Sequence, residues 1–241
     1  MDLADDRLPE APHVVVVYSD LHCSFAHLAT YRLHEARRLL GLEGRIWFDH
    51  RSFPLELFNE RVNSLRGVNS EASVIGALCP EAGWQLWQAA DWEYPVTTLP
   101  GMEAVAAAKR QSWAASEELD RGLRRAFWQE SRCISMRHVI RGVAADCPSV
   151  DLDRLTADLD AGICRPEPFA HFAQARGGRV VCSPHVFLHD GTNMANPGVR
   201  VRWANGRFGV GFPVVEAYDA SACTTLLTHA AALAGIAGPA A

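Results

Sequence analysis

The sequence predicts a mixed α/β fold that carries a large all-helical insertion. An apolar run over residues 13–19 precedes an amphipathic helical pattern, and a second alternating run follows at residues 45–53. This is the pattern of a strand, a helix and a parallel strand. Residues 55–176 then contain several helix-length periodic segments and no clear strand pattern. Strand patterns return only after residue 178.

The first elements have recognisable boundaries. The first strand is expected over residues 13–19, and the first helix over residues 23–40. Gly41 and Gly44 follow that helix and are expected to end it, because glycine adopts the left-handed conformation found after helix C-termini. The second strand is expected over residues 45–53, where apolar and polar residues alternate.

Helical patterns continue through the insertion. Helices are expected over Met102–Ala115 and Glu117–Glu130. Ser135 and Asp151 are the expected N-caps of two later helices, because such side chains accept hydrogen bonds from unpaired N–H groups. Gly162 is expected to end one of these helices.

Several tryptophans lie in the same region. Trp84 and Trp87 are spaced to share one helical face, which favours packing between insertion helices over a roof above an apolar substrate groove.

The C-terminal part returns to strands. Arg179–Gly191 predicts a strand, an interruption at Pro184 and a second strand. Val199–Trp203 alternates and leads into Asn205–Gly206, a pair that favours a two-residue hairpin turn. A final helix is expected over Val214–Gly235.

Composition excludes several classes of protein. The 241 residues are 49% hydrophobic and carry a formal net charge of −5, so the chain lacks the basic surface of a nucleic-acid-binding protein. No apolar stretch is long enough to span a bilayer, and the acidic N-terminus has no secretory signal pattern. We therefore expect a cytoplasmic protein with no nucleic-acid or membrane partner, and the Ala- and Arg-rich composition suggests a bacterial source.

The chain has seven cysteines and no pair spaced as CxxC. Neither a zinc site nor a disulfide framework is expected from an odd number of unpaired cysteines in a reducing compartment. Most of these cysteines are expected to be small core residues.

Cys23 differs from the other cysteines because it lies where the first strand meets the first helix. The unpaired N–H groups and the dipole of a helix N-terminus favour thiolate over thiol. We therefore expect Cys23 to be a nucleophile with a depressed pKa. Three residues later the chain has Ala26, so no second thiol is available on the same turn.

The order of these motifs resembles the DsbA-like thioredoxin superfamily. Its FrnE-like branch, which includes 2-hydroxychromene-2-carboxylate isomerases and kappa-class glutathione transferases, is the most similar. The resemblance rests on Cys23 after the first strand, on Arg124–Glu130 and on Pro184, and it covers most of residues 13–235. It implies a thioredoxin-like fold in which residues 12–54 and 177–238 form one domain and residues 55–176 form a helical insertion. It also implies a cis Ser183–Pro184 bond facing the cysteine.

Further site residues follow from these positions. His22, His27 and His185 are candidates for tuning the pKa of Cys23 or for acid-base chemistry, although each is also a candidate core or solvated histidine. Cys182 is a candidate resolving thiol, with a buried strand cysteine as the alternative. The remaining candidates are expected to contact a substrate or thiol; they are Ser24, Phe25, Ser183 and Pro184.

Three functions remain open. The first is a thiol-disulfide oxidoreductase that uses Cys23 and a low-molecular-weight thiol such as glutathione, mycothiol or bacillithiol, with no tightly bound cofactor and no metal. Its partner would be a small thiol or disulfide, or a protein thiol. The second is a thiol-dependent isomerase or transferase of the 2-hydroxychromene-2-carboxylate isomerase type. The third is a binding protein without redox activity, which a normal or raised pKa of Cys23 would favour.

Overall fold

The first strand lies inside a four-stranded sheet whose order is β2-β1-β3-β4. A computed structural model describes residues 8–206 and 211–236. Strand β1 pairs in parallel with β2 and antiparallel with β3, and β3 pairs antiparallel with β4. The strands of this sheet are β1 (Val14–Ser19), β2 (Trp47–Ser52), β3 (His185–Phe187) and β4 (Asn193–Ala195).

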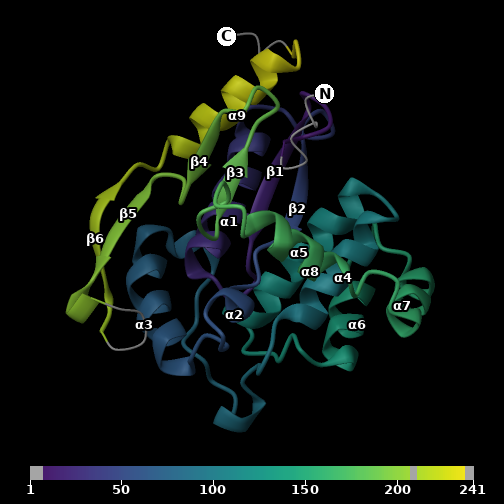
Figure 1. The fold of residues 1–241 in the computed structure, drawn as a ribbon, viewed down its shortest axis with the longest axis vertical. Coiled ribbons are helices and arrows are strands. Elements are labelled where there is room, and N and C mark those ends of the chain that lie inside the picture. The colour runs from purple at the N-terminus through teal and green to yellow at the C-terminus, as the bar shows by residue number, and fades with distance from the viewer. Residues whose placement is uncertain (1–7, 207–210, 237–241) are drawn as a thin grey trace.

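Helices cover both faces of this sheet (Figure 1). All six residues of β1 are buried, and successive side chains point to opposite faces. Val15 and Val17 pack with α1 (Ser24–Leu39) and α9 (Ala222–Leu233). On the other face, Val16 and Tyr18 pack near the end of α8 (Glu167–Ala175). The sheet is therefore the middle layer of three.

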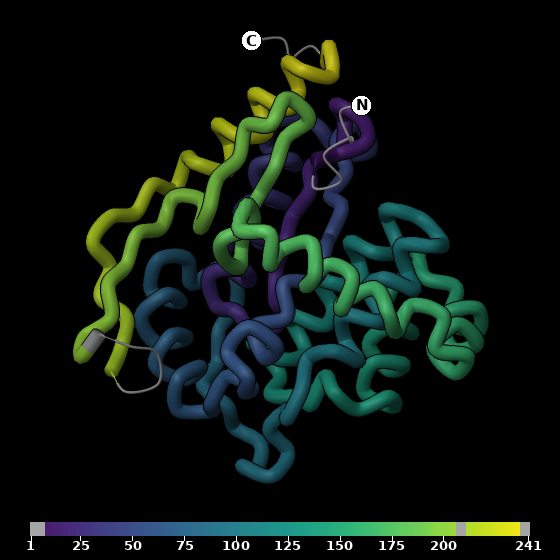
Figure 2. The backbone as a smooth tube through the Cα atoms, viewed as in Figure 1, coloured from purple at the N-terminus to yellow at the C-terminus, as the bar shows by residue number. Residues whose placement is uncertain are grey.

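The expected helical insertion is present and separates β2 from β3. Figure 2 shows the chain leaving the sheet after β2 and returning through α8 to β3. The helices before α8 are α2 (Leu55–Phe58), α3 (Leu65–Ile75), α4 (Leu99–Lys109), α5 (Trp113–Trp128), α6 (Arg137–Ala145) and α7 (Leu152–Ala161), with 3-10 turns at Gly76–Leu78, Pro80–Ala82 and Asp91–Glu93. Helices α4 to α7 share a hydrophobic core, to which Leu21 and two residues of α3, Val68 and Ala72, also belong.

Two expected boundaries in the insertion are wrong. The helix expected over Met102–Ala115 ends at Lys109, because Ser112 takes an extended conformation and caps α5 by accepting a hydrogen bond from the Ala115 N–H. Ser135 does not cap α6; its hydroxyl donates to the Thr97 carbonyl instead. Asp151 does cap α7, and Gly162 ends α7 in the left-handed conformation.

Trp84 and Trp87 pack against the core of the insertion, but they do not lie on a helix. Trp84 and Trp87 lie in an irregular connector, so the expected shared helical face is wrong. Trp84 packs edge-on against Trp128, with ring centroids 5.4 Å apart, and Trp87 contacts Phe127. Aromatic packing rather than helical periodicity places them.

The C-terminal part also departs from expectation. No strand forms over residues 179–182, because this segment turns back on β3 and the Val181 N–H donates to His185 Nδ1 at 3.2 Å. The final helix begins at Ala222 and not at Val214, because residues Pro213–Tyr218 form strand β6. Strand β6 is rich in β-branched and aromatic residues and pairs antiparallel with β5 (Val199–Trp203).

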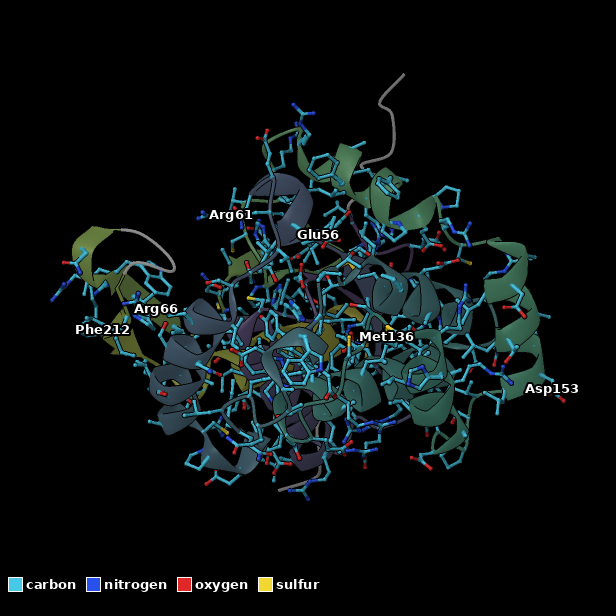
Figure 3. All side chains as sticks on the ribbon, turned by 90° about the horizontal axis from the view of Figure 1, so that it is seen from below. Glu56, Arg61, Arg66, Met136, Asp153 and Phe212 are labelled. Atoms are coloured by element: carbon cyan, nitrogen blue, oxygen red, sulfur yellow. The ribbon has the colours of Figure 1, made fainter. Side chains whose placement is uncertain are left out.

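The hairpin of β5 and β6 stands apart from the main sheet. Its connection is longer than the two-residue turn expected at Asn205–Gly206: Ala204–Gly206 form a 3-10 turn, and the Ala204 N–H donates to the Phe212 carbonyl. Figure 3 shows Phe212 on the hairpin at one side of the molecule and Asp153 of α7 at the other. The main sheet lies between the β5–β6 hairpin and α7.

Candidate functional site

Cys23 is the N-cap residue of α1 and faces the loop before β3. Its Sγ donates a hydrogen bond to the Ser183 carbonyl oxygen at 3.0 Å. The Ser183–Pro184 bond is cis, as expected. Residues about 160 positions apart therefore meet at one point, and Cys23 is only 4% exposed there.

Asp20 organises the turn that carries Cys23. One carboxylate oxygen accepts from the His22 N–H at 2.8 Å and the other from the Leu55 N–H at 2.7 Å. The Asp20 N–H donates to the Ser183 hydroxyl at 2.8 Å, which ties the turn to the proline loop. Burial raises the pKa of Asp20 to about 6, although the two N–H groups oppose that rise.

Helix α5 holds the same turn from the insertion. Arg124 donates to the Asp20 carbonyl at 3.0 Å and to the Ser19 hydroxyl at 2.8 Å. Trp128 donates its indole N–H to the Leu21 carbonyl at 3.0 Å. Arg124 is almost fully buried, and its charge is balanced by Asp120 one turn earlier, at 2.7 Å. The turn is thus fixed by three strong donors from one helix.

Glu71 of α3 lies at the N-terminus of α1. Its carboxylate accepts a hydrogen bond from the hydroxyl of Ser24 at 2.8 Å. An anion at this position is stabilised by the helix dipole. Burial is the larger effect, however, and raises the pKa of Glu71 to about 7. The Glu71 side chain therefore lies beside the residue that follows Cys23, close to the start of α1.

The pKa of Cys23 differs from the sequence expectation. Burial, and to a smaller extent the nearby Glu71 carboxylate, together raise the pKa of the thiol to about 12. The hydrogen bond to Ser183 and the α1 backbone lower it, but by less. The expected lowering of the Cys23 pKa is wrong. A helix N-terminus stabilises a thiolate only where water or hydrogen-bond donors replace the hydration that the thiolate loses on burial.

No protein-family model matches this chain, and no curated protein matches it significantly. Solved structures do match. A probable DsbA oxidoreductase from Streptomyces coelicolor is 16% identical with a TM-score of 0.62, and the match covers 90% of this chain and 89% of that one. The cytosolic disulfide reductase DsbM from Pseudomonas aeruginosa, solved with GSH, is 14% identical with a TM-score of 0.59, covering 76% and 89%. A 2-hydroxychromene-2-carboxylate isomerase is 14% identical with a TM-score of 0.55, covering 75% and 87%.

The chain has a DsbA-like thioredoxin fold. In this DsbA-like fold, helices α4 to α8 form the insertion, and the Cys23 loop faces the cis-proline loop. The fold expected from the order of the motifs is confirmed.

His22 lies beside Cys23 but is enclosed by aromatic rings. It packs on Phe127, with centroids 4.2 Å apart, and near Tyr94 at 5.5 Å. Neither ring nitrogen has a hydrogen-bond partner among the described residues, and burial lowers its pKa to about 3. The ring is neutral at physiological pH, so it supplies no positive charge to the thiol.

His27 and His185 have structural partners. Nε2 of His27 contacts the carbonyls of Ala82 and Gly83 at 3.1 Å, and burial lowers its pKa to about 4. His185 bonds to Val181 through Nδ1 and to Asn193 through Nε2 at 3.0 Å. His27 therefore braces α1 against the 3-10 turn, and His185 braces the proline loop.

The other candidates, Cys182, Phe25 and Ser24, also have structural contacts. Cys182 is a free thiol whose Sγ donates to the Pro184 carbonyl at 3.2 Å, and burial raises its pKa. Phe25 of α1 is partly buried against the apolar cluster that contains Leu28 and Ile75. The hydroxyl of Ser24 is committed to Glu71. Of the expected residues, the structure brings Cys23 and Ser183 into direct contact.

Three residues of this site were not among the sequence candidates: Asp20, Glu71 and Arg124. Asp20 had a local signal, since an aspartate two residues before a turn N–H often accepts its hydrogen bond. Glu71 had none, because 47 residues separate it from Ser24.

No group of three or more His, Cys, Asp or Glu side chains suited to a metal ion occurs within residues 8–206 and 211–236. Over the same ranges no helix is both long and apolar enough to cross a bilayer.

Proposed function

We propose that this chain is a thiol-disulfide oxidoreductase that uses Cys23 together with a low-molecular-weight thiol. One observation carries the proposal: the Cys23 Sγ lies at the start of α1, 3.0 Å from the carbonyl oxygen that precedes Pro184, in a DsbA-like fold. The loop before Pro184 offers backbone groups beside the thiol, and extended peptides bind to such groups as an added strand.

The proposed exchange has two steps. Cys23 loses its proton to solvent, and the thiolate attacks one sulfur of a disulfide. The old S–S bond breaks, the departing sulfur takes up a proton, and Cys23 is left in a mixed disulfide. A small thiol then attacks that mixed disulfide, leaves as part of a new disulfide, and returns Cys23 to the thiol. The second thiol comes from solution because Ala26 occupies the position of a resolving cysteine.

Glutathione is the first choice for the small thiol, since DsbM was solved with GSH. Mycothiol and bacillithiol are the alternatives for a bacterial source. The match to a cytosolic reductase supports action in the cytoplasm, where reduced thiols are abundant.

Exposure to oxidised glutathione is expected to add one glutathione to the chain, at Cys23. Peptide mapping by mass spectrometry locates the adduct, and added reduced glutathione is expected to remove it. Cys23→Ser should lose the adduct, while Cys182→Ser, a matched change on the facing loop, should keep it. An adduct that forms mainly at Cys133 or Cys182 would rule out the proposed nucleophile.

Ala26→Cys is expected to give a dithiol that forms an internal disulfide with Cys23. Residues three apart on a helix share a face, and the Cα atoms of such residues lie within the range that a disulfide spans. Insulin reduction by the variant should exceed that of the wild type. Ala29→Cys is the matched control, since Ala29 is a buried alanine of the same helix but lies six positions from Cys23. Equal activity of the two variants would contradict the proposed geometry.

A second candidate function is a binding protein without redox activity. The observation in its favour is the raised pKa of Cys23, because few thiolates are present at neutral pH when the pKa is about 12. The glutathione experiment separates the two functions: a binding protein forms no adduct at Cys23. The isomerase-type reaction has less support, since the Ser24 hydroxyl is held by Glu71 and is not free to bind a thiolate.

A further inference from the structure

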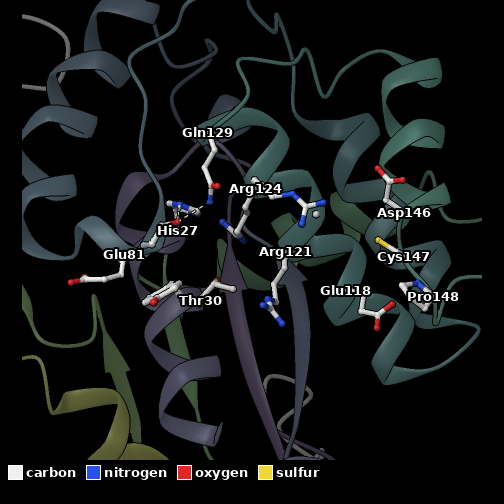
Figure 4. A pocket seen from close by; sticks show the side chains of 14 residues that line it. His27, Thr30, Glu81, Glu118, Arg121, Arg124, Gln129, Asp146, Cys147 and Pro148 are labelled. Carbon is white, nitrogen blue, oxygen red and sulfur yellow. Dashed lines mark hydrogen bonds between the residues drawn. The ribbon is translucent and has the colours of Figure 1, made fainter. Parts of the chain in front are cut away.

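A cavity of about 340 Å³ lies between α1 and α5, away from the Cys23–Ser183 contact. Figure 4 shows its walls: His27 and Thr30 of α1, Arg121 and Gln129 at the α5 side, and Asp146 across the cavity. The volume is in the range of small-molecule sites, roughly 300–1,000 Å³. Cys23, Ser183 and Pro184 do not line it.

The inner wall contains an unsatisfied hydroxyl. Thr30 is 3% exposed, and its Oγ1 has no hydrogen-bond partner among the described residues. A helical threonine ordinarily donates to the carbonyl one turn earlier, and Thr30 does not. A buried hydroxyl without a partner is costly. The oxygen is enclosed in this structure, so a rotation of the Thr30 side chain would bring it to a polar ligand atom in the cavity and would be stabilising.

Most charged side chains around the cavity are already engaged. The engaged groups are Arg124 with Asp120, Arg125 with Glu130, Glu118 with the Ser149 N–H and Glu81 with the Cys79 thiol. Arg121 and Asp146 are different: within residues 8–206 and 211–236, neither side chain makes a hydrogen bond or an ion pair. Both residues are exposed, and Figure 4 shows them on different parts of the cavity wall, with Asp146 beside Cys147.

We propose that this cavity binds a small zwitterion, with a carboxylate on Arg121 and an ammonium group on Asp146. The uncommitted charges are one cation and one anion, so a ligand of zero net charge matches them. A ligand carrying several negative charges is disfavoured by the carboxylates of Glu81, Glu118 and Asp146. Ala82, Cys147 and the Tyr31 ring supply apolar wall for a short hydrocarbon link. This site is independent of the thiol chemistry at Cys23.

The probe for the test is 6-aminohexanoate, which has both charged groups on one short chain. Titration into the ¹⁵N-labelled full chain, followed by amide chemical shifts, should move signals of Thr30, Gly122 and Cys147. Hexanoate and hexylamine each lack one charge and should bind more weakly, by about fivefold or more, because each loses one charge-assisted contact. Equal affinity for hexanoate, or no shifts at these residues with the zwitterion, would overturn the proposal.

Two variants assign the contacts. Arg121→Gln should weaken 6-aminohexanoate binding by about tenfold and bring it near that of hexylamine, and Asp146→Asn should bring it near that of hexanoate. Arg141→Gln is the matched control, since Arg141 is an exposed arginine of α6 that does not line the cavity. Loss of affinity in Arg141→Gln equal to that in Arg121→Gln would contradict the assigned contact.

Thr30→Val separates a ligand contact from a structural role. The change removes the hydroxyl at nearly constant volume, so the stability of the unliganded protein should stay equal or rise, because no existing hydrogen bond is broken. Affinity for 6-aminohexanoate should fall. A loss of stability with unchanged affinity would show that the hydroxyl serves the fold and not the ligand.

Discussion

Replacing Glu71 with glutamine is expected to raise the alkylation rate of Cys23 at pH 8 by about tenfold, which corresponds to a pKa decrease of about one unit. The Glu71 carboxylate lies at the N-terminus of α1 and adds a negative charge near the thiol, so its ionisation disfavours the thiolate. Glutamine keeps the size of the side chain and an oxygen that accepts the Ser24 hydroxyl. Iodoacetamide labelling with peptide mapping measures the rate at Cys23.

The difference between the two proteins depends on pH. The pKa of Glu71 is about 7, so the wild-type side chain is largely neutral at pH 5 and largely charged at pH 8. Glu71→Gln should therefore match the wild type at pH 5 and exceed it at pH 8. Glu81→Gln, which removes an exposed carboxylate hydrogen-bonded to Cys79, is the control and should leave the Cys23 rate unchanged. Equal rates for Glu71→Gln and wild type at pH 8 would falsify this role for Glu71.

The same substitution is expected to change how stability varies with pH. The folded-state pKa of Glu71 is raised from 4.5 to about 7, so the folded protein binds this proton more tightly than the unfolded chain does. The stability from this proton is complete below pH 4.5 and is lost as the pH rises to 7. Glu71→Gln should remove this pH-dependent loss of unfolding free energy, which amounts to at most about 3 kcal/mol. The comparison is the difference in unfolding free energy between variant and wild type at pH 4 and pH 8, in which the contributions of Asp20 and the buried histidines cancel.

Replacing Arg124 with methionine is expected to destabilise the protein by about 3–5 kcal/mol, because the buried Asp120 carboxylate loses its partner. The Asp20 carbonyl and the Ser19 hydroxyl lose their donors at the same time. Urea denaturation measures the effect. The turn that carries Cys23 should loosen, so alkylation of Cys23 in the folded variant should also become faster.

Two comparisons test the cause of this destabilisation. Adding Asp120→Asn to the Arg124 variant removes the unpaired charge and should restore part of the lost stability. Arg125→Met removes the next arginine, whose pair with Glu130 is exposed, and should cost less than about 1 kcal/mol. If the two single arginine variants are equally stable, the buried network does not anchor the turn.

The strand–helix–strand unit and the proline loop were predictable from the sequence because their signals are local. The run of Val14–Val17 is buried on both faces, and Gly41 and Gly44 end their helix region in left-handed conformations. The hairpin was harder to predict. Val214 and Val215 fit a helix start or a strand equally well in isolation, and pairing with β5 decides between them.

The site was predictable only in part. Cys23 and Ser183 were expected to meet, and they do so at 3.0 Å. The electrostatics were not predictable, because burial of the thiol and the approach of Glu71 from α3 depend on tertiary packing. A helix N-terminus suggests a thiolate when it is considered alone. Here the packed surroundings have the larger effect.

The attachment of the Cys23 turn to α5 has a consequence for hydrogen exchange. Arg124 and Trp128 bind the carbonyls of Asp20 and Leu21, so the turn cannot open while α5 stays docked. Residues that open together form one cooperative unit with a single opening free energy. The amide hydrogens around His22 should therefore exchange at the slow rate of the α5 interior rather than at the rate of a surface turn. If the insertion were cleaved or displaced, the turn that carries Cys23 would lose the hydrogen bonds that order it.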